Sequence, residues 1–242
     1  MFLKSIIKNS INSFISIIPL EWKRLANYYI YTIKKSSKIK NSESEFKKIY
    51  ETNTWKSEES RSGEGSTINS TKTIRKELPL LIHKYRIKSM LDVPCGDFNW
   101  MKTVPLNCSY IGGDIVPEIV ENNQNLYSSD KIQFKKIDIT LDTLTKVDLI
   151  FCKDCLQHLS YENVHKTLHN FKNSCSKFLL VTSYPKTQHN HDIYDGDYRA
   201  LNLLIEPFCL PKPILAIREK SKAPGVEADK TMYLYDLEKL TL

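Results

Sequence analysis

One short stretch constrains the fold more than any other part of the chain: Leu91-Asp92-Val93-Pro94-Cys95-Gly96-Asp97-Phe98-Asn99-Trp100. It starts as an apolar run, passes through a tight acidic turn that contains a proline and a glycine, and then opens a helical pattern. A strand, a tight turn and a helix in this order are typical of the first unit of an open α/β sheet. In such sheets, ligands bind at the carboxyl ends of the strands.

Apolar strand patterns and helical patterns alternate from residue 87 onward. The spacing predicts strands at 88–93, 110–115, 132–137, 147–152 and 178–183, and helices near 98–103, 117–126 and 161–172. A helical pattern at 67–85 precedes them, and its Pro79 is expected to kink it. Two further strands, at 213–219 and 230–235, follow without a full helix between them, which allows an antiparallel strand at one edge. We therefore expect an α/β fold of the Rossmann-like, doubly wound type, with a mostly parallel seven-stranded sheet, an antiparallel edge strand and an N-terminal helical extension.

The net charge of +7 is confined to the first part of the chain. Residues 1–50 carry 10 lysines and arginines against 3 glutamates, which accounts for the whole excess. Residues 51–242 are therefore neutral, and this argues against a nucleic-acid-binding surface. We expect a basic, amphipathic helical extension over residues 1–50 and one catalytic domain over residues 51–242.

Apolar residues recur at helical spacing over residues 2–20, interrupted by lysines and asparagines. This amphipathic pattern is too polar for a membrane span and lacks the features of a signal peptide. Two interpretations stay open: the apolar stripe packs on a second helix at 22–33, or residues 1–35 make peripheral contact with an anionic membrane. The interpretation for residues 36–48 is a solvated linker or helix edge. We expect a cytoplasmic protein, peripheral at the inner face of the membrane if the second interpretation holds.

Six cysteines without a convincing secretory signal indicate reduced thiols. Cys152 and Cys155 form one CxxC pair, which we interpret as structural thiols, the rival being a metal site that recruits His158. The segment His189-Asn190-His191-Asp192 is a candidate substrate loop, base or metal site. Both patterns are too short to predict a metal, and we expect none.

Loop 59–66 holds two of the 7 glycines of the chain, where average composition would give about 17 in total. Glycines retained in a glycine-poor chain point to positions where the backbone needs them. Arg61 in this loop can grip a carboxylate in bidentate geometry. We therefore prefer a functional interpretation of the loop to that of a plain surface connection.

Three acidic residues follow the ends of the first three predicted strands: Asp92, Asp114 and Asp138. The carboxyl ends of parallel strands meet at one edge of the sheet, so we expect these side chains to lie near one another. Asp114 lies 22 positions after Asp92, where a carboxylate can accept both hydroxyls of a ribose.

The turn after the first strand argues against a dinucleotide. A GxGxxG fingerprint is missing, since Pro94 and Phe98 stand where glycines would be. Asp97 would also repel a phosphate. A cofactor with ribose and adenine but without phosphate fits better than NAD or FAD, so a nicotinamide oxidoreductase is disfavoured.

Residues 88–183 resemble the class I methyltransferases that use S-adenosylmethionine. That family reads approximately D/E-x-G-x-G-x-G in the first turn, where this chain reads DVPCGDF and keeps the middle glycine, Gly96. The motifs LDVPCGDFNWM, ESRSGEGS and DCLQHLS are similar to a bacterial branch associated with surface-carbohydrate modification. The fourth strand is not followed by an N-P-P-Y or D-P-P-Y turn, which lowers the case for methylation of DNA adenine.

The resemblance implies S-adenosylmethionine as the cofactor. It implies that Asp92 and Gly96 position the methionine moiety, Asp114 the ribose, and Asp138 with Ile139 the adenine. The full expected cofactor-binding set is Arg61, Asp92, Cys95, Gly96, Asp97, Asp114, Ile115, Asp138 and Ile139.

Methyl transfer is an in-line displacement, so the protein aligns the two reactants and removes a proton when the acceptor is a hydroxyl. Asp154 and His158 follow the fourth strand and are four residues apart, so on a helical turn they would share a face. The carboxylate would then orient the imidazole base. The plainer interpretation is that Asp154 caps a helix and His158 packs beneath it. We expect transfer to an oxygen of a small molecule or glycan, the alternative being a catalytically silent binding or scaffold module with the same fold.

Overall fold

The computed structural model describes residues 41–219 and 229–242, and the chain from Ser42 to Leu242 packs as one compact unit. The predictions of an amphipathic helix and of membrane contact fall on residues that lie outside these ranges. Within the described ranges, no helix combines the length and the apolar character needed to cross a membrane.

The core of the unit is one seven-stranded sheet with the strand order β3-β2-β1-β4-β5-β7-β6. Strands β3, β2, β1, β4 and β5 run parallel, and β7 is antiparallel to both of its neighbours, β5 and the edge strand β6. This confirms the predicted Rossmann-like α/β fold. The strands are β1 (Ser89–Asp92), β2 (Ser109–Asp114), β3 (Ile132–Lys136), β4 (Leu149–Cys152), β5 (Phe178–Ser183), β6 (Leu215–Arg218) and β7 (Thr231–Asp236).

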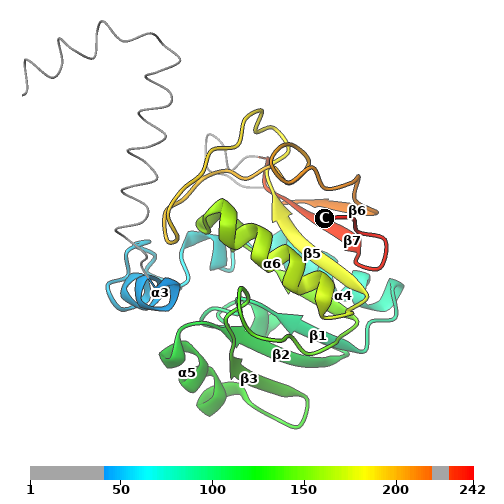
Figure 1. The fold of residues 1–242 in the computed structure, drawn as a ribbon. Helices are drawn as coiled ribbons and strands as arrows, with labels where there is room; N and C mark the ends of the chain where they lie inside the picture. The colour runs from blue at the N-terminus through cyan, green and yellow to red at the C-terminus, as the bar shows by residue number, and fades with distance from the viewer. Residues whose placement is uncertain (1–40, 220–228) are drawn as a thin grey trace, which may run out of the picture. The chain divides into compact units, whose positions relative to one another are not determined.

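Helices cover both faces of the sheet. Alternation along β4 shows how: Ile150 and Cys152 belong to one apolar cluster, and Leu149 and Phe151 belong to the other. Helix α6 (Tyr161–Asn173) contributes to the first cluster and α4 (Lys72–Lys84) to the second. Figure 1 shows α6 lying along β5. Burial on both faces explains why β4 and β5 appear in the sequence as mostly apolar runs, whereas the outer strands β3 and β6 are partly exposed.

Helix α3 (Ser42–Glu51) was not predicted, because its residues are polar and the sequence favoured a linker at 36–48. Its apolar side is short, with Ile49 as the buried residue, and ion pairs fix it to the domain. Lys47 pairs with Glu118 of helix α5 (Pro117–Tyr127), and Glu43 pairs with Lys136 of β3. This helix, which the sequence assigned to the extension, therefore packs with the domain.

Two other helical patterns differ from the structure in extent. Helix α4 begins at Lys72 instead of residue 67, and Pro79 lies within it without ending it. The pattern at 98–103 forms only a 3-10 turn, η2 (Met101–Thr103). The remaining 3-10 turns are η1 (Glu64–Ser66) and η3 (Leu156–His158).

Phe171 provides a test of the core beneath α6. Its side chain is 0% exposed, so Phe171→Ala should lower the free energy of unfolding by about 3–5 kcal/mol. Lys166→Ala, on the exposed side of the same helix, should change it by less than about 0.5 kcal/mol. Urea denaturation measures both, and similar values for the two variants would contradict this packing.

Candidate functional site

A cavity of about 1180 Å³ lies at the carboxyl edge of the sheet. Ligand pockets usually have volumes of about 300–1,000 Å³, so this cavity has room for more than one ligand. It is lined by the segments that follow β1, β2, β3 and β4, together with α3, the loop 61–66 and the start of β7. The strand order reverses between β1 and β4, which is where open α/β sheets bind ligands.

Asp114, at the end of β2, ties the first turn to the second strand. Its carboxylate accepts hydrogen bonds from the backbone N–H of Gly96 (3.1 Å) and of Val116 (3.0 Å). Burial raises the pKa of this carboxyl to about 6, although these two bonds oppose the shift. Gly96 has φ +55°, and a Cβ there would collide with Ser62 Oγ. The turn therefore requires glycine at this position.

Asp92, at the end of β1, lines the same cavity but is only 2% exposed. The hydroxyl of Tyr110 donates to its carboxylate at 2.6 Å. Burial raises the pKa of Asp92 to about 8, and the neighbouring Asp114 adds to the shift. Two buried carboxyl groups that line one cavity favour a ligand that carries positive charge.

Asp138 also lines the cavity, so the three acids after β1, β2 and β3 come together. Its Oδ1 accepts hydrogen bonds from the backbone N–H (2.8 Å) and the hydroxyl (2.6 Å) of Thr140. Ile115, Ile137 and Ile139 line this part of the cavity and give it an apolar wall. A planar base and a ribose suit such a combination of apolar side chains and carboxylates.

Two residues that the sequence grouped with the cofactor, Asp97 and Arg61, bind neighbouring parts of the chain in the structure. Asp97 lies outside the cavity lining, because its carboxylate accepts from Ser60 Oγ (2.8 Å) and from the backbone N–H of Arg61 (2.9 Å). The guanidinium of Arg61 reaches the carbonyl oxygens of Tyr50 and Glu51 at 3.4 Å, and so contacts the end of α3. Arg61 still borders the cavity.

Cys95 is buried in the turn and borders the cavity. The side-chain amide of Asn123, in α5, donates to its Sγ (3.8 Å) and to the carbonyl oxygen of Gly96 (2.7 Å). Helix α5 thereby gives the turn a second anchor besides Asp114.

Asp154 and His158 do not form the predicted carboxylate–imidazole pair. The chain after β4 makes the short turn η3 instead of a helix, and Asp154 takes φ +52°. Its carboxylate contacts Lys153 and Lys230 (2.9 Å) and accepts from Gln157 Nε2 (3.2 Å). Burial opposes ionisation, but the two ammonium groups outweigh it and hold the pKa of Asp154 well below its usual range.

His158 is oriented by a backbone group. Its Nδ1 lies 2.9 Å from the carbonyl oxygen of Asp197, which can only accept, so Nδ1 carries the proton and Nε2 keeps a lone pair. Burial lowers the pKa of the imidazole. The rings of Trp55 and Tyr198 lie 5.2 and 5.6 Å from the imidazole, centroid to centroid.

A buried charged cluster that the sequence did not predict lies at this end of the cavity: Lys153, Asp154, Glu219 and Lys230. Glu219 is 1% exposed and lies 3.9 Å from Lys153 Nζ and 3.6 Å from Lys230 Nζ. Lys153 could have been noticed, because it directly follows the apolar run of β4. Glu219 and Lys230 come from the ends of β6 and β7, and no short-range pattern links them to Asp154.

The acidic segment after β5 stabilises a helix. Asp192 and Asp195 accept hydrogen bonds from the backbone N–H groups of Tyr161 and Ser160, both at 2.7 Å, at the start of α6.

No group of three or more His, Cys, Asp or Glu side chains suited to a metal ion occurs within the described ranges. All six cysteines are free thiols, and burial raises the pKa of Cys152.

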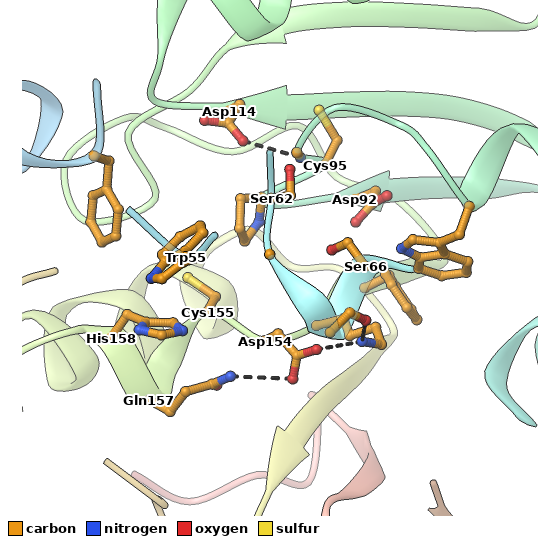
Figure 2. A pocket seen from close by; sticks show the side chains of 18 of the residues that line it. Trp55, Ser62, Ser66, Asp92, Cys95, Asp114, Asp154, Cys155, Gln157 and His158 are labelled. Carbon is orange, nitrogen blue, oxygen red and sulfur yellow. Dashed lines mark hydrogen bonds and ion pairs between the residues drawn. The ribbon is translucent and has the colours of Figure 1, made fainter. Parts of the chain in front are cut away.

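Figure 2 shows the cavity with Asp114 and Cys95 on one side, Asp154, Gln157 and His158 on the other, and Ser62 and Ser66 between them.

No protein-family model matches the chain, and no curated protein matches it by sequence. Solved structures do match. N-methyltransferase NodS from Bradyrhizobium japonicum WM9, in complex with S-adenosyl-L-homocysteine, has a TM-score of 0.57 at 12% identity, covering 78% of this chain and 97% of that chain.

Two further matches have the same architecture. An S-adenosylmethionine-dependent methyltransferase from Clostridium acetobutylicum ATCC 824 has a TM-score of 0.51 at 16% identity, covering 68% of this chain and 91% of that chain. The methyltransferase domain of bacterial CtHen1 has a TM-score of 0.52 at 10% identity, covering 69% and 100%. The chain has the class I methyltransferase fold. At these identities the likeness concerns the fold alone.

The ionisation of Asp92 predicts a pH dependence of stability. An aspartate in an unfolded chain titrates near pH 4, whereas folding raises the pKa of Asp92 to about 8. Between these values the folded state holds one proton more than the unfolded state. The free energy of unfolding should therefore fall by about 1.4 kcal/mol for each unit of rising pH.

Asp92→Asn removes this dependence, because an amide does not titrate yet still accepts from the Tyr110 hydroxyl. We expect the wild-type protein to lose stability relative to Asp92→Asn between about pH 5 and about pH 7. Urea denaturation at several pH values measures the difference. A difference that stays constant with pH would contradict a raised pKa for Asp92.

Proposed function

We propose that this protein transfers a methyl group from S-adenosylmethionine to an oxygen of a small molecule or glycan. The observation that carries the proposal is that one cavity holds both kinds of group. Three strand-end acids, Asp92, Asp114 and Asp138, border one half, which we call the donor half. The neutral imidazole of His158 and the carboxylate of Asp154 border the other, which we call the acceptor half. The class I fold supports the same activity, since the matched solved proteins include methyltransferases.

The residues of the donor half fit an adenosyl sulfonium ligand. Asp114 is available to the ribose hydroxyls, and Asp138 with Ile115 and Ile139 to the adenine. The backbone of the turn at Gly96 lines the cavity and is available to the methionine moiety. The buried carboxyl groups of Asp92 and Asp114 suit the positive charge of the ligand. When bound, the cofactor supplies an electrophilic methyl group on sulfur.

The residues of the acceptor half support proton removal from a hydroxyl. His158 is held as the Nδ1–H tautomer, so its Nε2 can take the proton while the oxygen forms its bond to the methyl carbon and the carbon–sulfur bond breaks. The carboxylate of Asp154, kept ionised by two lysines, can accept a hydrogen bond from a neighbouring hydroxyl.

The charge and shape of the acceptor half favour an uncharged, ring-bearing acceptor. Lys153 and Lys230 balance Asp154 and Glu219, so this end attracts neither anions nor cations strongly. Aromatic rings border the same space, namely Trp55, Tyr184 and Tyr198. Aromatic faces beside hydrogen-bonding groups suit a sugar or another cyclic alcohol.

The sequence-based expectations of a cytoplasmic location and of membrane contact through residues 1–35 stay predictions. Nucleic acid is disfavoured as the acceptor, because residues 51–242 carry no net charge.

Asp114 tests the donor half. Asp114→Ala should weaken binding of S-adenosylhomocysteine by about 1–3 kcal/mol, because charge-assisted hydrogen bonds to the ribose are lost. Asp130→Ala, at an exposed turn before β3, serves as the matched control and should bind as the wild type does. Isothermal titration calorimetry measures both affinities, and equal affinities would remove Asp114 from the site.

His158 tests the chemistry and separates the enzyme from a silent binding module. His158→Ala should lower kcat by about 100-fold to 10,000-fold while leaving the affinity for S-adenosylhomocysteine intact. Wild-type activity should fall at low pH as the imidazole becomes protonated. The assay follows a labelled methyl group from the donor into fractionated cell extract. A wild-type protein that binds the donor but labels nothing would favour the binding module.

A further inference from the structure

Lys153 has a position that the proposed reaction does not by itself explain. It follows β4 directly, and its side chain is only 4% exposed although it borders the cavity. Its Nζ donates to the carbonyl oxygen of Gly65 at 2.9 Å and contacts the carboxylate of Asp154. The ring of Trp100 lies 5.9 Å from the same nitrogen.

Stability alone is a weak reason to bury this ammonium group. Desolvating a lysine and its acidic partners is costly, and apolar side chains of similar size often serve as well or better. Asp154, its main partner, also holds a left-handed backbone conformation that side chains other than glycine adopt at a cost. Both features point to a constraint on where the carboxylate of Asp154 lies.

The loop Ser60–Ser66 connects this carboxylate to the turn after β1. At its first end, Ser60 Oγ donates to Asp97 (2.8 Å), and Ser62 Oγ accepts from the backbone N–H of Asp97 (2.9 Å). At its second end, Gly65 touches the charged cluster. A Cβ on Gly65 would lie 2.7 Å from Asp154 Oδ2, so the loop backbone packs directly against the carboxylate.

We propose that Lys153 is a positioning residue that holds the loop Ser60–Ser66 and the Asp154 carboxylate in one arrangement. The loop contacts the turn of the donor half through Asp97. Lys153 contacts both the loop, at Gly65, and Asp154, so the position of the loop determines where the Asp154 carboxylate lies in the acceptor half. The acceptor half therefore takes its working shape only when the loop is seated on the turn. The catalytic part of this inference rests on the proposed function, whereas the mechanical coupling does not.

Two variants break the coupling in different ways. Lys153→Met removes the ammonium group and keeps the length of the side chain. Gly65→Ala leaves every charge in place and pushes the loop away from Asp154; Gly65 has no left-handed φ, so alanine fits its backbone. Lys166→Met is the control, since Lys166 forms an exposed ion pair with Glu162 on α6.

Amide hydrogen exchange of the full-length protein without ligand tests the coupling. Both variants should speed exchange at Ser66, inside the loop, and at the amide of Asp97, which bonds to Ser62 at the far end. The expected increase is about tenfold or more at both positions. Unchanged exchange at Asp97 in Gly65→Ala would overturn the proposal even if Lys153→Met failed to fold.

Kinetics give a second readout. Both variants should bind S-adenosylhomocysteine within about threefold of the wild type while kcat falls about tenfold or more. Variants whose kcat equals that of Lys166→Met would overturn the positioning role. A wild-type protein that does not bind S-adenosylhomocysteine would instead overturn the proposed function, and the exchange experiment would still decide the coupling.

Discussion

The hydrogen bonds that the backbone N–H groups of Gly96 and Val116 donate to the carboxylate of Asp114 fix the geometry on which the rest of the site depends. They hold the turn after β1 against the end of β2, so the two strand ends open toward one cavity. The loop Ser60–Ser66 then rests on this turn, since Ser62 occupies the space that a side chain at position 96 would need. A displaced turn would therefore disturb the donor half and the loop together.

The carboxyl groups in the two halves of the cavity have pKa values shifted in opposite directions. Burial is the largest cause of the raised pKa values of Asp92 and Asp114. Asp154 is also buried, but Lys153 and Lys230 keep it ionised. The donor half thus gains when a cation arrives, whereas the acceptor half is already neutral. This difference suits a reaction between a positively charged donor and an uncharged acceptor.

Local patterns were enough to predict the sheet and the acids at its edge. Each predicted strand overlaps an observed one. Burial on both faces leaves a mostly apolar run in β4 and β5. The strand-end acids followed from the rule that parallel carboxyl ends converge. Helix α3 was missed because ion pairs to distant elements, and not its own apolar pattern, hold it in place. Asp97 was placed in the cavity because its hydrogen bonds to the loop at residues 60–61 cannot be inferred from spacing.

The contrast between Asp154 in the sequence and in the structure shows why the acceptor half could not be predicted. Spacing favoured a pair with His158, four residues away. The antiparallel strand β7 lies beside β5, and its first end brings Lys230 to Asp154 from 76 positions along the chain. The carboxylate binds this cation and Lys153, which leaves the imidazole to the carbonyl oxygen of Asp197. The insertion of β7 between β5 and β6 thus decides which partner each group receives, and that choice is made by topology.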